Sequence, residues 1–278
     1  MKIDGSQIVS GLKKELAQKV VFLRRRNITP HLAVILIDND PSSLAYIRQK
    51  EKMASELGVK FSNYQIAGSL NSKKELINLI HKLNKDKTVH GIIIQRPVPI
   101  DISRRELNKL VIPKKDIDGF HPKSPFTPPV AKALLVILEW VFKSKRAIYK
   151  KTFLSWLKKQ KILIIGRGET GGKPIAKTFK KMGIPYSVAH SQTKNLNELC
   201  LKADIIISCV GKPNIVRHNM VANKTTVIGV GLHLEKGKLQ PDYNQKKIGE
   251  KAEYYTPVPK GVGPVNVACL FENLLKAV

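Results

Sequence analysis

The stretch KILIIGRGETGGKP, residues 161–174, decides the fold of the second half of this chain. Residues 161–165 predict a buried strand, and the glycine pattern G-x-G-x-x-G follows at once and leads into a predicted helix over 172–182. These glycines permit a tight turn and a close approach of pyrophosphate to the backbone, while the helix N-terminus faces the anion. The motif alone is also compatible with a plain tight turn, but its position between a strand and a helix indicates a dinucleotide-binding site.

The end of the next strand indicates which dinucleotide binds. In NAD-binding proteins an acidic residue about 20 positions further on accepts hydrogen bonds from the ribose 2′-hydroxyl. Here the predicted strand over 185–189 ends instead in His190 and Ser191. These two side chains and Arg167 can hydrogen-bond to a 2′-phosphate, which a carboxylate would repel. The sequence therefore predicts NADP rather than NAD; the alternative is that Arg167 merely lies along the surface.

Strands and helices alternate along the whole chain. In the first half, strands are expected at residues 31–37, 59–66 and 89–95. Helices are expected over 8–23, between Asp40-Pro41 and Gly58, and after a capping box formed by Ser72 and Glu75. In the second half, further strands are expected at 185–189, 204–210 and 226–230, with helices over 195–201 and 267–277. This order of nearly continuous apolar strands predicts an α/β protein with two doubly wound parallel sheets, the second of Rossmann type.

Composition excludes several classes of protein. The 278 residues are 42% hydrophobic and 25% charged, which excludes a mainly disordered chain and suits one large or two ordinary domains. The three cysteines form no C-x-x-C pair and no zinc-ligand cluster, so we expect no metal site and a reducing compartment. The apolar stretch over 133–142 contains Glu139 and is too short to span a bilayer, which predicts a buried helix. Since the N-terminus has no signal-peptide pattern, we expect a cytoplasmic protein with no membrane partner.

The charge is the anomaly in the composition. Its 49 Lys and Arg residues against 21 Asp and Glu give a formal net charge of +28, which would attract nucleic acid, acidic membranes or phosphorylated small molecules. Residues 143–161 carry eight basic side chains in nineteen and no acidic one, interleaved with aromatic residues. One explanation of this charge is therefore that the chain is a nucleic-acid-associated Rossmann protein. The other is a general bias toward lysine that has no function. A nucleic-acid-binding protein would not need the polar constellation described next, which argues against that partner.

A tyrosine and a lysine form the first candidate site. Tyr46 and Lys50 stand four residues apart on a predicted helix and so share one face, with Ser43 one turn earlier. A desolvated lysine can lose its charge and act as an acid or a base, and a neighbouring phenol can position or polarise a substrate. The same spacing is common on ordinary surfaces. Gln95 adds an amide at the carboxyl end of a predicted strand, where open α/β sheets bind ligands.

Two loops add further candidates. Residues 116–121, DIDGFH, place two carboxylates and an imidazole on one loop. They form either a turn built on Asp-Gly or a site whose carboxylate accepts hydrogen bonds from a ligand's amino groups, and they are a weak pattern for a metal. Residues 256–264, TPVPKGVGP, predict a stiff loop that enters the last helix and suits close backbone approach to a flat ligand.

In this order, these residues closely resemble the bifunctional methylenetetrahydrofolate dehydrogenase/methenyltetrahydrofolate cyclohydrolase family. The matching stretches are SSLAYIRQKEK, GIIIQRPVP, KKDIDGFHP, GRG with GGKP, AHSQTKNL, ADIIISCVGKPNIV and YTPVPKGVGPVNVACLFENLL. The resemblance implies NADP-dependent oxidation of 5,10-methylenetetrahydrofolate to the methenyl form, then hydrolysis to 10-formyltetrahydrofolate, in a homodimer. It also implies a ligand cleft between a folate-binding catalytic domain, over 1–122 and 264–278, and a Rossmann domain over 161–263, joined by a helix and basic linker over 123–160.

The resemblance also assigns roles to single residues. Lys50 would be the catalytic lysine of the hydrolytic step, tuned by Gln95. Tyr46 would stack on the folate, and Asp118 would hold its pterin amino group. The remaining positions are Gly166, Arg167, Gly168, His190, Ser191 and Leu232 for the cofactor, and Ser43, Pro259, Gly261, Gly263 and Pro264 for the substrate. NADP and polyglutamylated folate are both polyanions, so part of the positive charge would aid their capture.

Several positions depart from the family pattern. PGGVGPMT reads PKGVGPVN here, with changes at Lys260, Val265 and Asn266. PCTP reads PFTP at Phe126, and VIDVGIN reads VIGVGLH at Gly229 and His233. A family member with only one of the two activities, or another NADP oxidoreductase, therefore stays open as an alternative.

Overall fold

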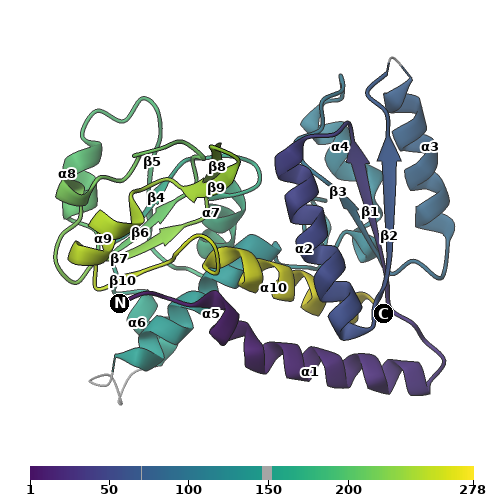
Figure 1. Ribbon diagram of the computed structural model, residues 1–278, viewed down its shortest axis with the longest axis horizontal. Helices are drawn as coiled ribbons and strands as arrows, with labels where there is room; N and C mark the ends of the chain where they lie inside the picture. Colours follow the sequence, from purple (N-terminus) through teal and green to yellow (C-terminus); the bar gives the residue numbers. More distant parts are fainter. Residues whose placement is uncertain (70, 146–151) are drawn as a thin grey trace. The chain divides into compact units, whose positions relative to one another are not determined.

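The computed structural model describes residues 1–69, 71–145 and 152–278, which form two compact α/β units (Figure 1). The N-terminal unit comprises Ser10–Pro129 and Val267–Val278, and the central unit comprises Met1–Val9 and Val130–Asn266. The main sheet of each unit is parallel, which confirms the predicted fold class. Within the described ranges, no helix has both the length and the apolar character needed to cross a membrane.

The N-terminal unit is built on a three-stranded sheet of order β2-β1-β3. Its strands are β1 (His31–Ile37), β2 (Lys60–Ile66) and β3 (Gly91–Ile94). Its helices are α1 (Gly5–Arg25, which begins in the central unit), α2 (Pro41–Leu57), α3 (Ser72–Lys85), α4 (Arg104–Leu110), the 3₁₀ turn η1 (Pro113–Lys115) and most of α10 (Val262–Ala277). All seven residues of β1 are buried, as the central strand of a sheet covered on both faces must be.

Helices cover the two faces of this sheet. Leucines and isoleucines of α3 and α4 pack against Ala33 and Ile35 on one face. On the opposite face, Leu274 of α10 lies so close to Gly91 that a Cβ there would be 2.7 Å from its Cδ1. The last helix of the chain therefore belongs to the core of the first sheet, and β3 needs a glycine where that helix crosses it.

The ends of α2 are fixed by the residues that predict them. The side chain of Asp40 accepts a hydrogen bond from the backbone N–H of Ser43 at 2.8 Å, and Pro41 takes the first helical position. At the other end Gly58 adopts the left-handed conformation, with φ of 73°, and its N–H caps the last turn. Since both caps are local, the helix that carries Tyr46 and Lys50 has a fixed register.

The predicted capping box of α3 is wrong. Asn71 is the N-cap, and Ser72 is the first helical residue. The Ser72 hydroxyl donates to the carbonyl oxygens of Ala67 and Ser69, at 2.6 and 2.8 Å, and so braces the turn before the helix. The backbone N–H of Glu75 bonds to the Asn71 carbonyl. The serine has the right spacing for a capping box but sits one position too far into the helix.

The central unit contains a five-stranded sheet of order β10-β7-β6-β4-β5 and a separate antiparallel pair, β8-β9. The strands are β4 (Ile162–Ile165), β5 (Ser187–Ala189), β6 (Ile205–Ser208), β7 (Thr226–Gly229), β8 (Leu232–Glu235), β9 (Lys238–Pro241) and β10 (Tyr254–Tyr255). The helices are α5 (Pro129–Ser144), α6 (Phe153–Leu157), α7 (Gly172–Lys181), α8 (Leu196–Leu201), the 3₁₀ turn η2 (His218–Met220) and α9 (Gln245–Lys251). Strand order reverses at β4, which places the β4–α7 turn at the switch point of the sheet.

Predicted boundaries differ from the observed ones mainly at strand ends. β3, β6 and β7 are shorter than the apolar runs that predict them, and α10 begins at Val262 rather than 267. The elements α4, α9, β8 and β9 were not predicted, because each is short and only partly apolar.

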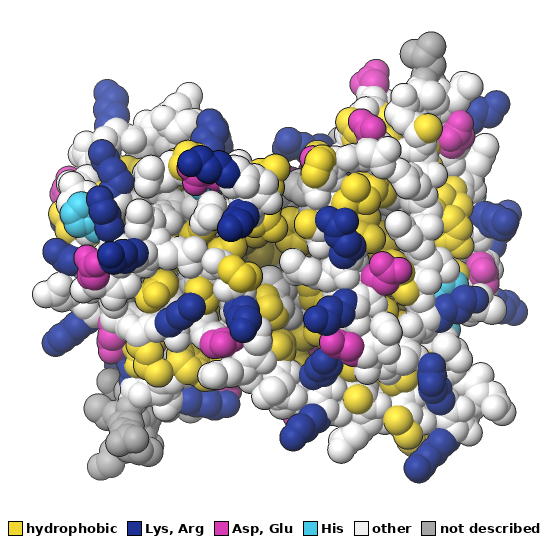
Figure 2. Space-filling model, in the orientation of Figure 1, with side chains coloured by type: hydrophobic (Ala, Val, Ile, Leu, Met, Phe, Trp, Pro, Cys, Tyr) yellow, Lys and Arg dark blue, Asp and Glu magenta, His cyan; other side chains and the backbone are white. Residues whose placement is uncertain are grey.

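Aromatic residues pack together at the described ends of the basic segment over 143–161. Its residues 146–151 lie outside the described ranges. Trp156 of α6 is 7% exposed, and its ring centroid lies 5.5 Å from that of Phe142 and 6.2 Å from that of Phe153. These rings pack on one another instead of forming an open stacking platform. On the face drawn in Figure 2, Lys and Arg side chains are scattered over each unit rather than gathered in one block.

Asn273 joins α10 to the loop that carries Asp118. Its side-chain amide is 2% exposed and donates to the carbonyl oxygens of Ile117 and Thr127, both at 2.9 Å. These two carbonyls flank the loop. A single buried amide therefore fixes the loop on the last helix of the N-terminal unit.

Replacing Asn273 by Ala should lower the free energy of unfolding by roughly 2–3 kcal/mol, because two buried carbonyl groups lose their donor. Urea denaturation followed by circular dichroism measures the loss. The matched control is Asn78→Ala on the exposed side of α3, which should change stability by less than about 0.5 kcal/mol. Equal effects of the two substitutions would contradict the assigned role of Asn273.

Candidate functional site

Lys50 is a buried polar group of the N-terminal unit whose pKa is lowered. Its side chain, on α2, is 9% exposed, and its ammonium donates to Gln95 Oε1 at 2.8 Å. Burial lowers the pKa of Lys50, and the negative charge of Asp118 offsets part of that effect. A lysine in this setting gives up its proton more readily than an exposed one. It can therefore act as a base or an acid.

Gln95 is fixed in the orientation that this contact needs. It directly follows β3, and its backbone N–H continues the sheet by donating to the Ile35 carbonyl at 2.8 Å. Its side-chain Nε2 donates to the Arg96 carbonyl at 3.0 Å, which leaves Oε1 to face Lys50. The prediction that Gln95 stands at the carboxyl end of a strand is confirmed.

The loop over 116–121 brings a carboxylate to the same place. Gly119, with φ of 75°, turns the chain after Asp118, and its N–H donates to the Asp116 carbonyl at 3.1 Å. Burial raises the pKa of Asp118, and the charges of Lys50 and Arg96 act in the opposite direction. The turn expected from Asp-Gly and the carboxylate facing a lysine are therefore both present.

Asp116 stabilises its own loop and makes no hydrogen bond to Lys50 in the structure. It is 4% exposed and accepts a hydrogen bond from the backbone N–H of His121 at 2.7 Å. Burial raises its pKa to about 6, with a smaller contribution from Asp118. The protonated form of Asp116 is thus favoured in the folded protein relative to the unfolded chain.

Tyr46 and Ser43 complete the predicted face of α2. Tyr46 lies one turn before Lys50, and burial raises the pKa of its phenol. Ser43 is buried, and its hydroxyl lies 3.5 Å from the Arg96 carbonyl oxygen. Lys50, Gln95 and Asp118 are thus brought together from three separate parts of the sequence.

The predicted cofactor positions gather at the carboxyl edge of the central sheet. Gly166 has φ of 100°, and its N–H donates to the Ala189 carbonyl at 2.8 Å, so the turn lies beside His190 and Ser191. A Cβ on Gly172 would lie 1.9 Å from the Gly166 carbonyl oxygen, which makes glycine obligatory where α7 starts. A Cβ on Gly168 would meet nothing within 4 Å, so this backbone is open to a ligand. The turn fits a pyrophosphate.

The remaining predicted positions lie in the central unit. The carbonyl of Leu232 would be 2.9 Å from a Cβ on Gly211, so β8 packs closely on the loop after β6. Pro259, Gly261, Gly263 and Pro264 belong to this unit, whereas Tyr46, Lys50 and Asp118 belong to the N-terminal unit. Gly229 faces Tyr243: a Cβ there would be 2.9 Å from the phenol oxygen, so any side chain would displace that ring.

Two polar residues with roles at these sites were not predicted from the sequence. Asp242, fully buried, accepts hydrogen bonds from the Ser208 hydroxyl at 2.5 Å and from the backbone N–H groups of Val210, Gly211 and Lys212 at 2.8–3.0 Å. It holds the loop after β6 at the carboxyl edge of the sheet. In the N-terminal unit, Arg96 faces Asp118. Neither carries a local sequence signal, since both act through distant partners.

Among the described residues, no three His, Cys, Asp or Glu side chains converge as a metal site would require.

Comparison with protein families finds one family over both units. Residues 3–118 match the catalytic domain of tetrahydrofolate dehydrogenase/cyclohydrolase, and residues 148–278 match its NAD(P)-binding domain. The chain is 35% identical to the bifunctional protein FolD of Bacillus pumilus over 279 aligned residues, covering 99% of this chain and 96% of that protein. It is 36% identical to the bifunctional protein FolD of Bacillus subtilis, with the same coverage.

Solved structures agree with these matches. The bifunctional methylenetetrahydrofolate dehydrogenase/cyclohydrolase from Campylobacter jejuni is 33% identical, with a TM-score of 0.88 over 100% of this chain and 98% of that one. The Trypanosoma brucei enzyme, solved with NADP and an inhibitor, is 26% identical, with a TM-score of 0.87 over 100% and 96%.

The raised pKa of Asp116 predicts a pH dependence of stability. Since the fold binds this proton more tightly than the unfolded chain does, the contribution of Asp116 to stability falls as pH rises from about 4 to about 6. Asp116→Asn should therefore unfold like the wild type near pH 4 and be about 1–3 kcal/mol more stable at pH 7. Urea titrations at several pH values measure this difference.

The control for this experiment is Asp101→Asn, which removes an exposed carboxylate from the same unit. It should leave the pH dependence unchanged. If Asp116→Asn gave a pH–stability curve parallel to that of the wild type, Asp116 would not be the titrating group.

Proposed function

The chain belongs to the tetrahydrofolate dehydrogenase/cyclohydrolase family, and from this membership we propose which residues carry its reactions and which cofactor it prefers. It is a bifunctional enzyme of one-carbon metabolism, with methylenetetrahydrofolate dehydrogenase and methenyltetrahydrofolate cyclohydrolase activities. In the first reaction a hydride leaves the methylene carbon, and in the second, water adds to the methenyl carbon and opens the ring to the 10-formyl product.

We assign the proton transfers of the hydrolytic step to Lys50. The observation that carries this assignment is its buried side chain, bonded to Gln95 and with a lowered pKa. A neutral amine here can take a proton from the attacking water, and the resulting ammonium can return one as the ring opens. Gln95 accepts a hydrogen bond in either state of the lysine and so keeps the nitrogen in place.

Asp118 and Tyr46 are the proposed substrate contacts of the N-terminal unit. An ionised Asp118 accepts hydrogen bonds from the amino group of the pterin, which fixes the ring system with respect to Lys50. The ring of Tyr46, on the same face of α2 as Lys50, stacks on the folate. Ser43 supports this face, and Pro259, Gly261, Gly263 and Pro264 are proposed as further substrate contacts.

The family domain over 148–278 binds NAD(P), and we propose that NADP is preferred. When bound, the cofactor accepts the hydride of the first reaction. The open backbone at Gly168 supports pyrophosphate binding by the turn, while Arg167, His190 and Ser191 would bind the 2′-phosphate. Leu232, at the start of β8, would contact the other end of the cofactor. We also propose a cytoplasmic homodimer that takes polyglutamylated folates.

A coupled assay tests the whole proposal. The purified protein should reduce NADP⁺ only when methylenetetrahydrofolate is supplied, and it should accelerate hydrolysis of the methenyl compound. Folded protein that performs the hydrolysis without the oxidation would support the single-activity alternative instead.

Replacing Lys50 by Met should reduce the rate of methenyltetrahydrofolate hydrolysis by about 10²-fold or more, because the general base is lost. Stopped-flow absorbance measures the rate. The matched control is Lys52→Met, which removes an exposed lysine from the same helix and should keep full activity. Hydrolysis at the wild-type rate by Lys50→Met would show that Lys50 is not the base.

Replacing Arg167 by Ala should weaken NADP binding by about tenfold and leave NAD binding almost unchanged, because only NADP carries the 2′-phosphate. Isothermal titration calorimetry of both dinucleotides gives the two ratios. Lys177→Ala, which removes an exposed cation from α7, is the control. Equal losses for NADP and NAD in Arg167→Ala would count against the phosphate contact.

A further inference from the structure

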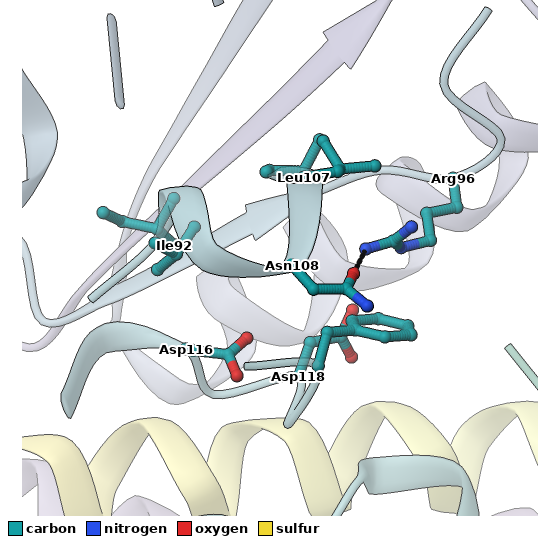
Figure 3. Close-up of a pocket in the computed structure, with 9 residues that line it drawn as sticks. Ile92, Arg96, Leu107, Asn108, Asp116 and Asp118 are labelled. Carbon is teal, nitrogen blue, oxygen red and sulfur yellow. Dashed lines mark hydrogen bonds between the residues drawn. The ribbon is translucent and has the colours of Figure 1, made fainter. Parts of the chain in front are cut away.

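Arg96 lies beside Asp118, and the proposed mechanism gives it no task. It follows Gln95 directly, and its guanidinium carbon lies 4.1 Å from the centroid of the Phe120 ring. One of its Nη atoms donates to the side-chain oxygen of Asn108. Figure 3 shows this guanidinium held between Asn108 of α4 and the Asp118 loop, in the small cavity that these residues line.

Arg96 is one of two cations that act on Asp118. Asp118 is partly buried, and burial raises its pKa, whereas Lys50 and Arg96 both favour its ionised form. The groups that face Asp118 are thus Lys50 from α2, Arg96 from the segment after β3, and Asp116 from its own loop. On the side toward α10, the loop meets the neutral amide of Asn273.

The proposed hydrolytic step removes one of the two cations. When Lys50 gives up its proton, a carboxylate with no other cationic partner would be left desolvated, which is strongly unfavourable. A guanidinium keeps its charge throughout the range in which proteins fold, whereas a lysine ammonium does not. Arg96 therefore offers Asp118 a partner whose charge is independent of the state of Lys50.

We propose that Arg96 is a positioning residue for the reaction: its guanidinium, held by Phe120 and Asn108, is the permanent counter-charge that keeps Asp118 ionised while Lys50 exchanges its proton. This inference rests on the proposed function. The planar guanidinium suits the task because its face stacks on an aromatic ring while its N–H groups donate hydrogen bonds within its own plane. Arg96 thereby acts through Asp118 and does not contact the reacting atoms.

The test is the pH dependence of hydrolysis in Arg96→Leu. Loss of the cation should move the acidic limb of kcat/KM, where Asp118 becomes protonated, upward by about one pH unit. At pH values on this limb the shift should appear as a KM raised by up to about tenfold with a much smaller change in kcat, since Asp118 holds the substrate. Arg96→Lys, which keeps the charge, should keep the limb near its wild-type position.

These variants distinguish the effect of the Arg96 charge from an effect of the substitution on the fold. Arg105→Leu, which removes an exposed arginine from α4, should leave the profile unchanged. An unmoved limb in Arg96→Leu, or the same displacement in Arg96→Leu and Arg96→Lys, would overturn the proposal. If Arg96→Leu failed to fold, Arg96→Gln would replace it, since glutamine removes the charge and can still donate to Asn108.

A second measurement keeps this inference separate from the proposed function. Protein labelled with ¹³C in its aspartate carboxyl groups reports the titration of Asp118 without any substrate, with the signal assigned through Asp118→Asn. The midpoint should be about one pH unit higher in Arg96→Leu than in the wild type. Equal midpoints would refute the role of Arg96, whereas a wild type that hydrolyses no methenyltetrahydrofolate would refute the proposed function instead.

Discussion

The burial of one lysine ammonium beside an amide oxygen is the interaction on which the chemistry of this protein depends. Lys50 and Gln95 are separated by 45 positions in the sequence, yet their side chains lie 2.8 Å apart in a buried site. Taking the ammonium out of water makes its proton easier to lose, and the amide keeps the nitrogen in place once the charge is gone. The caps of α2 and the central strand β1 help to place this pair, and the turn at Gly119 brings Asp118 toward it.

Parallel sheets explain why the functional groups gather where they do. In both units the strands end on one edge of the sheet, and the loops that leave this edge carry the polar residues. Gln95 follows this rule in the N-terminal unit, and the turn at Gly166 with His190 follows it in the central unit. Buried polar anchors stiffen these loops. Asn273 binds the carbonyls of Ile117 and Thr127, and Asp242 accepts three backbone N–H groups after β6.

The sequence predicted those parts of the fold that depend on local signals. The strand over 31–37 and the helix between Asp40 and Gly58 were confirmed because an apolar run, an N-cap, a proline and a left-handed glycine act within a few residues. Ser72 was misplaced because a capping-box spacing does not state which residue begins the helix. Short elements such as β8 and β9 gave no periodic signal at all.

The site shows the same division between local and distant causes. Motif resemblance indicated Lys50, Gln95 and Asp118, and the structure brings them together. The contacts of Arg96 with Phe120 and of Asp242 with the loop after β6 join residues 24 and about 30 positions apart, so no window of sequence reveals them. The basic, aromatic segment over 143–161 suggested a nucleic-acid platform, but Trp156 is buried against its aromatic neighbours.

The most direct test of the central claim is a titration of the Lys50 side chain in the folded protein. Heteronuclear NMR of protein labelled with ¹³C at the lysine ε-carbons, with the Lys50 signal assigned through Lys50→Met, gives its midpoint without reference to any assay. The account predicts a midpoint clearly below the ordinary lysine value of 10.5. A midpoint at or above that value would mean that burial does not prepare Lys50 to lose its proton, and would contradict the account.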